Sequence, residues 1–165
     1  MKLSRVFTIN LLIVMEMFAL SFWAWGQLPT DAQIATRFAF DGSPVGYMGK
    51  TEGLLLEPLI ALVFTLICPI LPKIEPTNLK RSKPAYAIFS LALVIFLSIV
   101  QGAIVFGALG KTTDTLKIIV FALGGFLIIF GNYLSKIRRN HFFGVRTPWT
   151  LSSDLAWHKT HRWGS

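Results

Sequence analysis

The sequence predicts an all-α integral membrane protein, a bundle of about four transmembrane helices with an interfacial C-terminal helix. Of its 165 residues, 53% are hydrophobic and 15% are charged, whereas a soluble domain carries about 25% charged residues. Several apolar runs reach the roughly 18 to 20 residues that a helix needs to cross a bilayer. These runs are continuous, whereas the strands of a transmembrane barrel would alternate polar and apolar residues.

Charge and cysteine content narrow the function classes. The formal net charge is +8, which in a soluble protein suggests nucleic acid as a partner. Here the basic residues flank apolar runs, so we expect contact with the lipid bilayer surface and no direct contact with nucleic acid. Cys68 is the single cysteine and lies inside an apolar run. A single cysteine cannot form an intrachain disulfide or a cysteine-based metal site. We also expect no cofactor.

The apolar runs divide the chain into alternating spans and connections. Residues 1–25 begin with two basic residues and continue with about 20 apolar ones, longer than the 7 to 15 residues of a signal-peptide core. We therefore expect an uncleaved first transmembrane helix. The remaining segments are expected to be an extracytoplasmic loop cap at 26–53, transmembrane helices at 54–71, 85–109 and 116–134, a cytoplasmic basic loop at 72–84, an extracytoplasmic turn at 110–115 and a cytoplasmic segment at 135–165.

The density of Lys and Arg along the chain predicts its orientation. Two precede the first apolar run, the loop at 26–53 has two in 28 residues, the loop at 72–84 has four in 13, and six follow the last run. Because Lys and Arg concentrate on the cytoplasmic side, both termini and the loop at 72–84 are expected in the cytoplasm.

The loop at 26–53 is too apolar for a plain solvated linker. Residues 41–44, Asp-Gly-Ser-Pro, are typical of a turn. Residues 28–35 could begin a short helix with Thr30 or Asp31 as its N-cap. We therefore expect a small structured cap on the membrane surface.

Three polar side chains fall inside the predicted spans: Glu16, Glu57 and Gln101. A charged side chain at mid-membrane costs roughly 2.5 to 3.5 kcal/mol on insertion scales, so such a residue is protonated, paired or beside water. If all three converged on one cavity, the protein would be a membrane-embedded enzyme or small transporter. The alternative to a functional role for Glu16 is a structural one, in which its neutral side chain is hydrogen-bonded to another helix. Small residues at 103 and 107, and at 124 and 131, predict helix-packing faces.

The last segment predicts a short amphipathic helix after a stiff connector. Pro148 biases Thr147 towards an extended backbone. Ser152 or Ser153 is a suitable N-cap, and the helix is expected to run to about His161. Trp157 and Trp163 suit an interfacial position, so the plain interpretation is a helix lying on the inner membrane surface.

The alternative to a membrane-surface helix in this segment is a metal site. Asp154, His158 and His161 stand at i, i+4 and i+7, which places them on one helical face. With His141 or water they could bind Zn²⁺. No high-specificity metal or nucleophile motif accompanies them, so we expect neither a metal nor a catalytic residue.

Two stretches of this chain resemble the SdpI-like membrane proteins, a family named for the immunity protein of the sporulation-delaying toxin system. The longer stretch, residues 140–162, is called the signature segment and carries twelve signature residues: Asn140, Phe142, Gly144, Arg146, Thr147, Pro148, Trp149, Trp157, Lys159, Thr160, His161 and Arg162. The second stretch resembles an extracytoplasmic loop shared with a wider class of uncharacterised membrane proteins, through Arg37, Phe38, Gly42, Gly46, Tyr47 and Lys50.

The outer loop departs from the family pattern. Ala35 stands where Pro is usual, Arg37 where His is usual, Ala39 where Asn is common and Val45 where Asp is common. A polar site that the usual His and Asp share would be altered here. Family members usually continue with two more transmembrane helices, so the resemblance implies a C-terminal truncation.

The resemblance implies a non-enzymatic function, immunity of a bacterial cell to a secreted membrane-active peptide toxin, and a location in the bacterial inner membrane. It also implies signalling, in which a cytoplasmic winged-helix repressor is sequestered at the membrane. By position, the outer loop would contact the toxin and the signature segment would contact the repressor.

Overall fold

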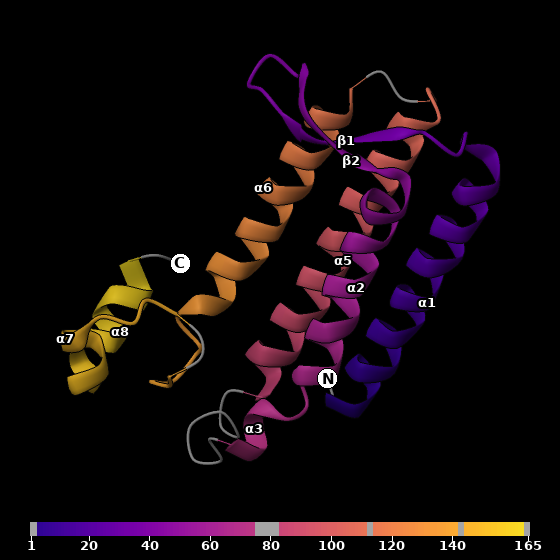
Figure 1. The fold of residues 1–165 in the computed structure, drawn as a ribbon. Helices are drawn as coiled ribbons and strands as arrows, with labels where there is room; N and C mark the ends of the chain where they lie inside the picture. The colour runs from indigo at the N-terminus through magenta and orange to yellow at the C-terminus, as the bar shows by residue number, and fades with distance from the viewer. Residues whose placement is uncertain (1–2, 75–82, 112–113, 142–143, 164–165) are drawn as a thin grey trace.

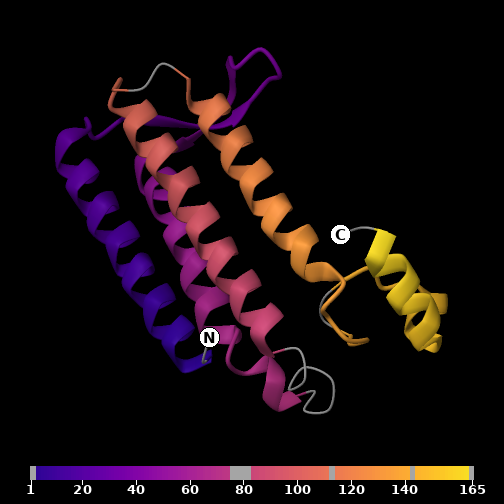
Figure 2. The same cartoon turned by 180° about the vertical axis from the view of Figure 1, so that it is seen from behind.

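Four long helices run side by side and form the body of the molecule (Figure 1). The computed structural model describes residues 3–74, 83–111, 114–141 and 144–163. The long helices are α1 (Leu3–Gln27), α2 (Lys50–Ile67), α5 (Lys83–Ala108) and α6 (Thr115–Leu134). Helix α5 is central, because it packs against α1, α2 and α6. The view from behind shows α6 at one side of the bundle, away from α1 (Figure 2).

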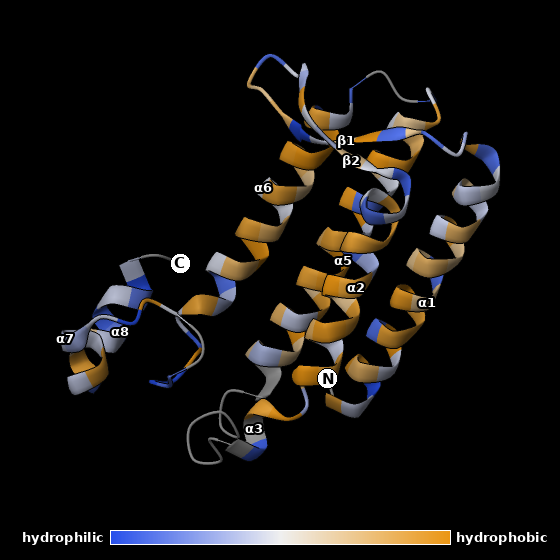
Figure 3. Cartoon of the chain, viewed as in Figure 1, coloured by the Kyte–Doolittle hydropathy of each residue, from blue (hydrophilic) through white to orange (hydrophobic). Residues whose placement is uncertain are grey.

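Three of the long helices are long and apolar enough to cross a membrane, within the described residues: Leu3–Gln27, Ala85–Ala108 and Thr115–Leu134. The fourth, α2, has 18 residues and carries Lys50, Glu52 and Glu57 in its first half. Most of its remaining residues are hydrophobic, like those of the neighbouring helices (Figure 3). The predicted all-α membrane bundle is confirmed.

The connection between α1 and α2 folds as a β-hairpin, so the prediction of a short helix at residues 28–35 is wrong. Strand β1 (Gln33–Phe38) pairs antiparallel with β2 (Pro44–Gly49). The β-branched residues Ile34 and Thr36 favour a strand. A partner strand eleven residues further on outweighs the local helix signal.

The predicted turn at residues 41–44 is confirmed. Asp41 Oδ1 accepts hydrogen bonds from the Ser43 hydroxyl at 2.7 Å and from the Ser43 backbone N–H at 2.9 Å. Gly42 has a φ of +87°, which favours glycine. Both bonds stabilise the ionised carboxylate, the hydroxyl most, and so lower the pKa of Asp41 from its ordinary value.

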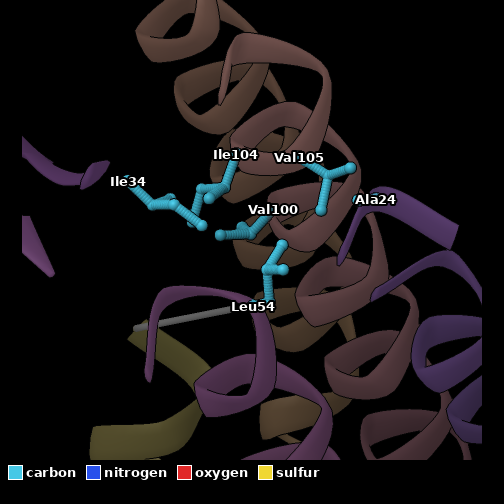
Figure 4. Packing of buried hydrophobic residues seen from close by; sticks show 6 residues of the cluster. All are labelled: Ala24, Ile34, Leu54, Val100, Ile104 and Val105. Carbon is cyan, nitrogen blue, oxygen red and sulfur yellow. The ribbon is translucent and has the colours of Figure 1, made fainter. Parts of the chain in front are cut away.

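One hydrophobic side chain fixes the hairpin to the bundle. Ile34 of β1 is fully buried and belongs to a cluster with Leu54 of α2 and Ile104 of α5 (Figure 4). Gly53 makes this approach possible, because a Cβ at that position would lie only 2.7 Å from the Ile34 Cβ. The hairpin therefore sits directly on the ends of α2 and α5.

Two short helices follow α6, and the first of them begins at Pro148, inside the segment that was predicted to be a stiff connector. Helix α7 (Pro148–Ser152) begins with a capping box between Thr147 and Thr150. Thr147 is extended, with φ −104° and ψ 160°, as Pro148 predicts. Helix α8 (Asp154–Trp163) is capped by Ser153, whose hydroxyl accepts a hydrogen bond from the Ala156 N–H at 3.3 Å. A short helix, α3 (Leu71–Ile74), follows α2.

The packing seam predicted along α6 is not formed at Gly124. A Cβ added at Gly124 would meet no other atom within 4 Å. Helix α6 packs chiefly on α5, and its other faces are exposed apolar surface. At the predicted small-residue face of α5, Ala103 is buried.

Candidate functional site

The signature segment is anchored to the bundle by Trp157. Its side chain is 0% exposed and packs in a cluster with Ala85 of α5 and with Leu134 and Ile137 at the end of α6. Its indole Nε1 donates a hydrogen bond to the Ile137 carbonyl at 2.8 Å. The prediction that Trp157 lies at the membrane interface is therefore wrong, because tertiary packing covers both its ring and its N–H group.

His161 is buried beside Trp157 and uses both ring nitrogens. Nε2 accepts a hydrogen bond from the Val145 backbone N–H at 3.0 Å, and Nδ1 lies 2.8 Å from the Trp157 carbonyl. Since a backbone N–H can only donate, Nε2 must be unprotonated, and Nδ1 carries the hydrogen that Trp157 accepts. The two rings stack with centroids 4.0 Å apart. His161 therefore ties α8 to the preceding loop.

Gly144 is required at its position for two reasons. Its φ is +102°, a conformation that other residues rarely adopt. A Cβ at this position would also collide with His161 Nε2 and lie 3.1 Å from the Trp157 ring. The signature residues Gly144, Trp157 and His161, separated in the sequence, thus form one contact.

Three further signature residues are joined to the backbone around this contact. The buried Thr150 hydroxyl donates to the Val145 carbonyl at 2.7 Å, while the N–H of Thr147 donates to Thr150 Oγ1 at 2.9 Å. Asn140 is buried and donates to the Arg138 carbonyl at 2.8 Å. Arg146 donates to the His141 carbonyl at 2.7 Å. Phe142 lies outside the described residues.

Arg139, in the basic cluster after α6, holds α7 and α8 together. It donates to the Leu151 carbonyl at 2.7 Å and pairs with Asp154 at 2.8 Å between Nε and Oδ1. Sequence reasoning expected only that basic residues beside the apolar runs contact the bilayer surface, and it missed this role. No local pattern joins an arginine to a carboxylate fifteen residues later.

The metal alternative is not supported by this geometry. His161 has no ring nitrogen left for a metal, and Asp154 is paired with Arg139. In the part of the chain that the structure describes, no three His, Cys, Asp or Glu side chains are grouped to hold a metal ion.

The signature segment exposes several basic and aromatic side chains. Trp149 and Trp163 are exposed, Trp163 at 91%. Lys159 and Arg162 are exposed on α8 beside Trp163. Thr160 is half-buried between them. Trp149, Lys159 and Trp163 are thus exposed to solvent, whereas Trp157 and His161 are buried.

A second group of polar side chains lies inside the bundle, around the carbonyl of Leu54. In a helix this oxygen would accept from the N–H four residues later, but that residue is Pro58, which has none. The Ser21 hydroxyl of α1 donates to the Leu54 oxygen at 2.7 Å, and Gln101 Nε2 of α5 donates to it at 3.0 Å. Three helices therefore meet at one buried carbonyl.

The three intramembrane residues predicted from the sequence do not form one site. Gln101 is fully buried at the Leu54 carbonyl, whereas Glu16 is exposed on the outer surface of α1. Glu57 is half-buried on α2, and its Oε2 has no hydrogen-bond partner among the described residues. Sequence reasoning missed Ser21, although a proline four residues after Leu54 already indicated a carbonyl in need of a donor.

The outer-loop residues divide between structural contacts and exposed surface. Lys50 donates to the Leu28 carbonyl at 2.7 Å and lies 5.3 Å from the centre of the Trp25 ring. The Arg37 side chain covers Gly46, where a Cβ would collide with it. Phe38 and Tyr47 border a cavity of about 310 Å³ between the hairpin and the ends of α5 and α6, and Gly42 lies at its edge.

Comparisons with known proteins match both candidate regions. The model of the SdpI/YfhL protein family matches residues 136–165, and that of a domain of unknown function, DUF1648, matches residues 12–62. The chain is 29% identical over 157 residues to the immunity protein SdpI of Bacillus subtilis (strain 168), covering 95% of this chain and 73% of that protein. No solved structure matches the chain. The signature segment, the region of α1, the hairpin and α2, and the alignment along nearly the whole chain agree in their similarity to SdpI-like membrane proteins.

Proposed function

We propose that this chain is a multi-pass immunity protein that protects its cell from a secreted membrane-active peptide without enzymatic catalysis. The observation that carries the proposal is the alignment with the immunity protein SdpI over 95% of the chain. It includes both the hairpin and the signature segment. In the signature segment, both ring nitrogens of the buried His161 are engaged with backbone groups, so His161 is not placed to act as a general base.

The hairpin faces the cell exterior in this proposal, and the signature segment faces the cytoplasm of a bacterial cell. The hairpin lies at one end of the bundle, while the N-terminal end of α1 and helix α3 lie at the other (Figure 1). The Lys and Arg residues concentrate at that second end, as expected for the cytoplasmic side.

Helix α5 is the element that can couple the two ends. Near the hairpin, Ile104 packs with Ile34, and Gln101 holds the Leu54 carbonyl. At the opposite end, Ala85 belongs to the cluster around Trp157. A peptide bound at the hairpin would change the signature segment only if it bound one arrangement of α5 more tightly than another.

The exposed signature residues are the proposed binding surface for a cytoplasmic repressor. Lys159, Arg162, Trp149 and Trp163 offer positive charge and aromatic rings, which are enriched in protein interfaces. A winged-helix repressor held at this surface would be kept away from its operator. The chain itself would not contact DNA.

Expression in a toxin-sensitive strain tests the immunity proposal. Cells that express the chain should survive a dose of sporulation-delaying peptide that kills cells with an empty vector. The double variant Lys159→Ala, Arg162→Ala should leave survival intact but release a fluorescently tagged repressor from the membrane. Unchanged killing of cells that express the wild-type chain in the membrane would contradict the proposal.

A further inference from the structure

Glu16 has no partner among the described residues of its own chain, although it lies deep in a membrane-spanning helix. It stands near the middle of α1, thirteen residues after Leu3 and eleven before Gln27, and its side chain is exposed. No residue that the structure describes forms a hydrogen bond or an ion pair with its carboxyl. Because α1 is long and apolar enough to cross a membrane, this carboxyl faces the hydrocarbon of the bilayer.

The carboxyl of Glu16 cannot reach water at this depth. At a rise of about 1.5 Å per residue it lies roughly 16 Å from the nearer end of α1, which is much further than a Glu side chain extends. Ionisable groups inside a membrane are costly, and they pair with other groups for this reason. The exposed neighbours on α1, namely Leu12, Met15 and Ala19, are apolar and offer no such group. A second molecule therefore has to supply the hydrogen-bond partner.

The outer face of α1 is free to receive that molecule. Leu12, Glu16 and Ala19 stand at i, i+4 and i+7 and form an exposed stripe. Both ribbon views place α1 at one edge of the bundle, with α6 at the other (Figure 1; Figure 2). Ala19 is small enough to let the backbone of another helix come close. The buried side chains of α1 lie on a different face and pack towards α2 and α5: Val6, Asn10, Val14, Met17, Ser21 and Ala24.

A second copy of the chain supplies a matching group at the same depth. Both copies insert in the same orientation, because the distribution of Lys and Arg sets it, so two α1 helices would meet in parallel. A twofold axis along the membrane normal brings the two stripes together, and such an interface repeats every contact. The two Glu16 carboxyls then face each other. A carboxyl pair shares a proton and forms a hydrogen bond, because two like charges in contact cannot both ionise.

We propose that two copies of this chain associate in the membrane through the outer face of α1, with their Glu16 carboxyls hydrogen-bonded to each other. The inference is independent of the proposed immunity function, because the contact needs neither a peptide nor a repressor. It lies on the side of the bundle away from α6, so it leaves the signature segment uncovered (Figure 2). Lipid, or a helix of another protein, is the alternative occupant that the experiment has to separate.

The first test measures association in lipid vesicles. Chains labelled at the N-terminus with a donor or an acceptor dye are mixed, and energy transfer is followed as lipid dilutes them. Glu16→Leu should raise the dissociation constant about five- to thirtyfold, as expected for the loss of an interhelical hydrogen bond in a membrane. Glu16→Gln should stay within about threefold, because an amide also donates and accepts. Both substitutions lie on an exposed face, so neither should disturb the fold.

The second test locates the contact. Ala19→Cys on the stripe and the matched control Phe121→Cys on α6, where Phe121 is 80% exposed, are made in a Cys68→Ser background and oxidised in vesicles. A disulfide requires Cα atoms within about 7 Å of each other. Ala19→Cys should therefore give covalent dimers, and Phe121→Cys should not. Addition of Glu16→Leu to Ala19→Cys should slow the crosslinking several-fold.

Three results would overturn the inference. Energy transfer of the wild-type chain no greater than that of randomly mixed monomers would leave lipid or another protein as the occupant of the stripe. Crosslinking at Phe121→Cys instead of Ala19→Cys would show that the copies meet through α6. Association that is unchanged in Glu16→Leu, or weakened equally in Glu16→Gln and Glu16→Leu, would show that hydrogen bonding between these side chains does not hold the pair.

Discussion

The hairpin and the signature segment are held to the bundle in opposite ways. The hairpin is fixed mainly by Ile34, and many of its side chains, including Tyr47, remain exposed around a cavity. The signature segment is fixed by side chains that hydrogen-bond to the chain's own backbone: Trp157, His161, Thr150 and Arg139.

The difference shows that residues of a sequence signature can serve either local structure or contact with another molecule. Gly144, Trp157 and His161 stabilise the local fold, because they contact one another and His161 hydrogen-bonds to the backbone of the same segment. Phe38 and Tyr47 leave surface free for another molecule. Substitutions at the two ends should therefore have different consequences, the first on local stability and the second on recognition.

Removing Trp157 should have the largest effect. Trp157→Ala deletes a fully buried ring and leaves the Ile137 carbonyl without its donor, which should cost the segment about 3 to 5 kcal/mol. Limited proteolysis within residues 144–163 should become at least tenfold faster, while the hairpin keeps its protection. Trp163→Ala is the control, and equal cleavage of both variants would show that Trp157 is not the anchor.

Ile34→Ala should weaken the attachment of the hairpin, at the opposite end of the bundle, without affecting the signature segment. It should destabilise the docking of the hairpin by about 2 to 4 kcal/mol because a buried side chain is truncated. Hydrogen exchange of amides in β1 and β2 should accelerate, and that of α8 should not. Val45→Ala, at an exposed position of β2, should leave exchange unchanged.

Gly144→Ala tests whether the signature glycine is needed for its backbone or for space. The positive φ alone should cost about 1 to 3 kcal/mol, and the collision with His161 adds to it. The exchange rate of the Val145 amide should rise, since its bond to Nε2 is lost. Gly125→Ala in α6, where a Cβ meets no atom within 4 Å, should be neutral or slightly stabilising. If the Val145 amide exchanged equally fast in both variants, Gly144 would not be needed for the contact with Trp157 and His161.

Asp154→Asn should have the smallest effect. The Arg139–Asp154 pair is exposed to solvent, with 73% of the Asp154 side chain accessible, so its loss should cost at most about 1 kcal/mol. Proteolysis should change less than about fivefold, the factor that 1 kcal/mol allows. A change as large as that of Trp157→Ala would show that the pair, rather than the buried ring, holds the segment.

Local rules within a few residues of the sequence determined much of this protein. Continuous apolar runs predicted the helical membrane bundle, Asp41 to Pro44 predicted the hairpin turn, and Pro148 predicted the extended Thr147. Ser153 was one of two predicted caps for α8 and is the one used. Each of these features depends on interactions between residues close together in the chain, so it can be predicted from the sequence alone.

Contacts between distant residues were decided only by the tertiary structure. The strand pairing of residues 33–38 replaced a local helix signal. Packing buried Trp157, which the sequence placed at the interface, and His161, which was a ligand only in the alternative metal hypothesis. Glu16 lies outside the bundle, while Ser21 and Gln101 meet at the carbonyl that Pro58 leaves without a donor. Such contacts depend on how helices rotate and pack against one another, and local patterns of residues do not specify that rotation.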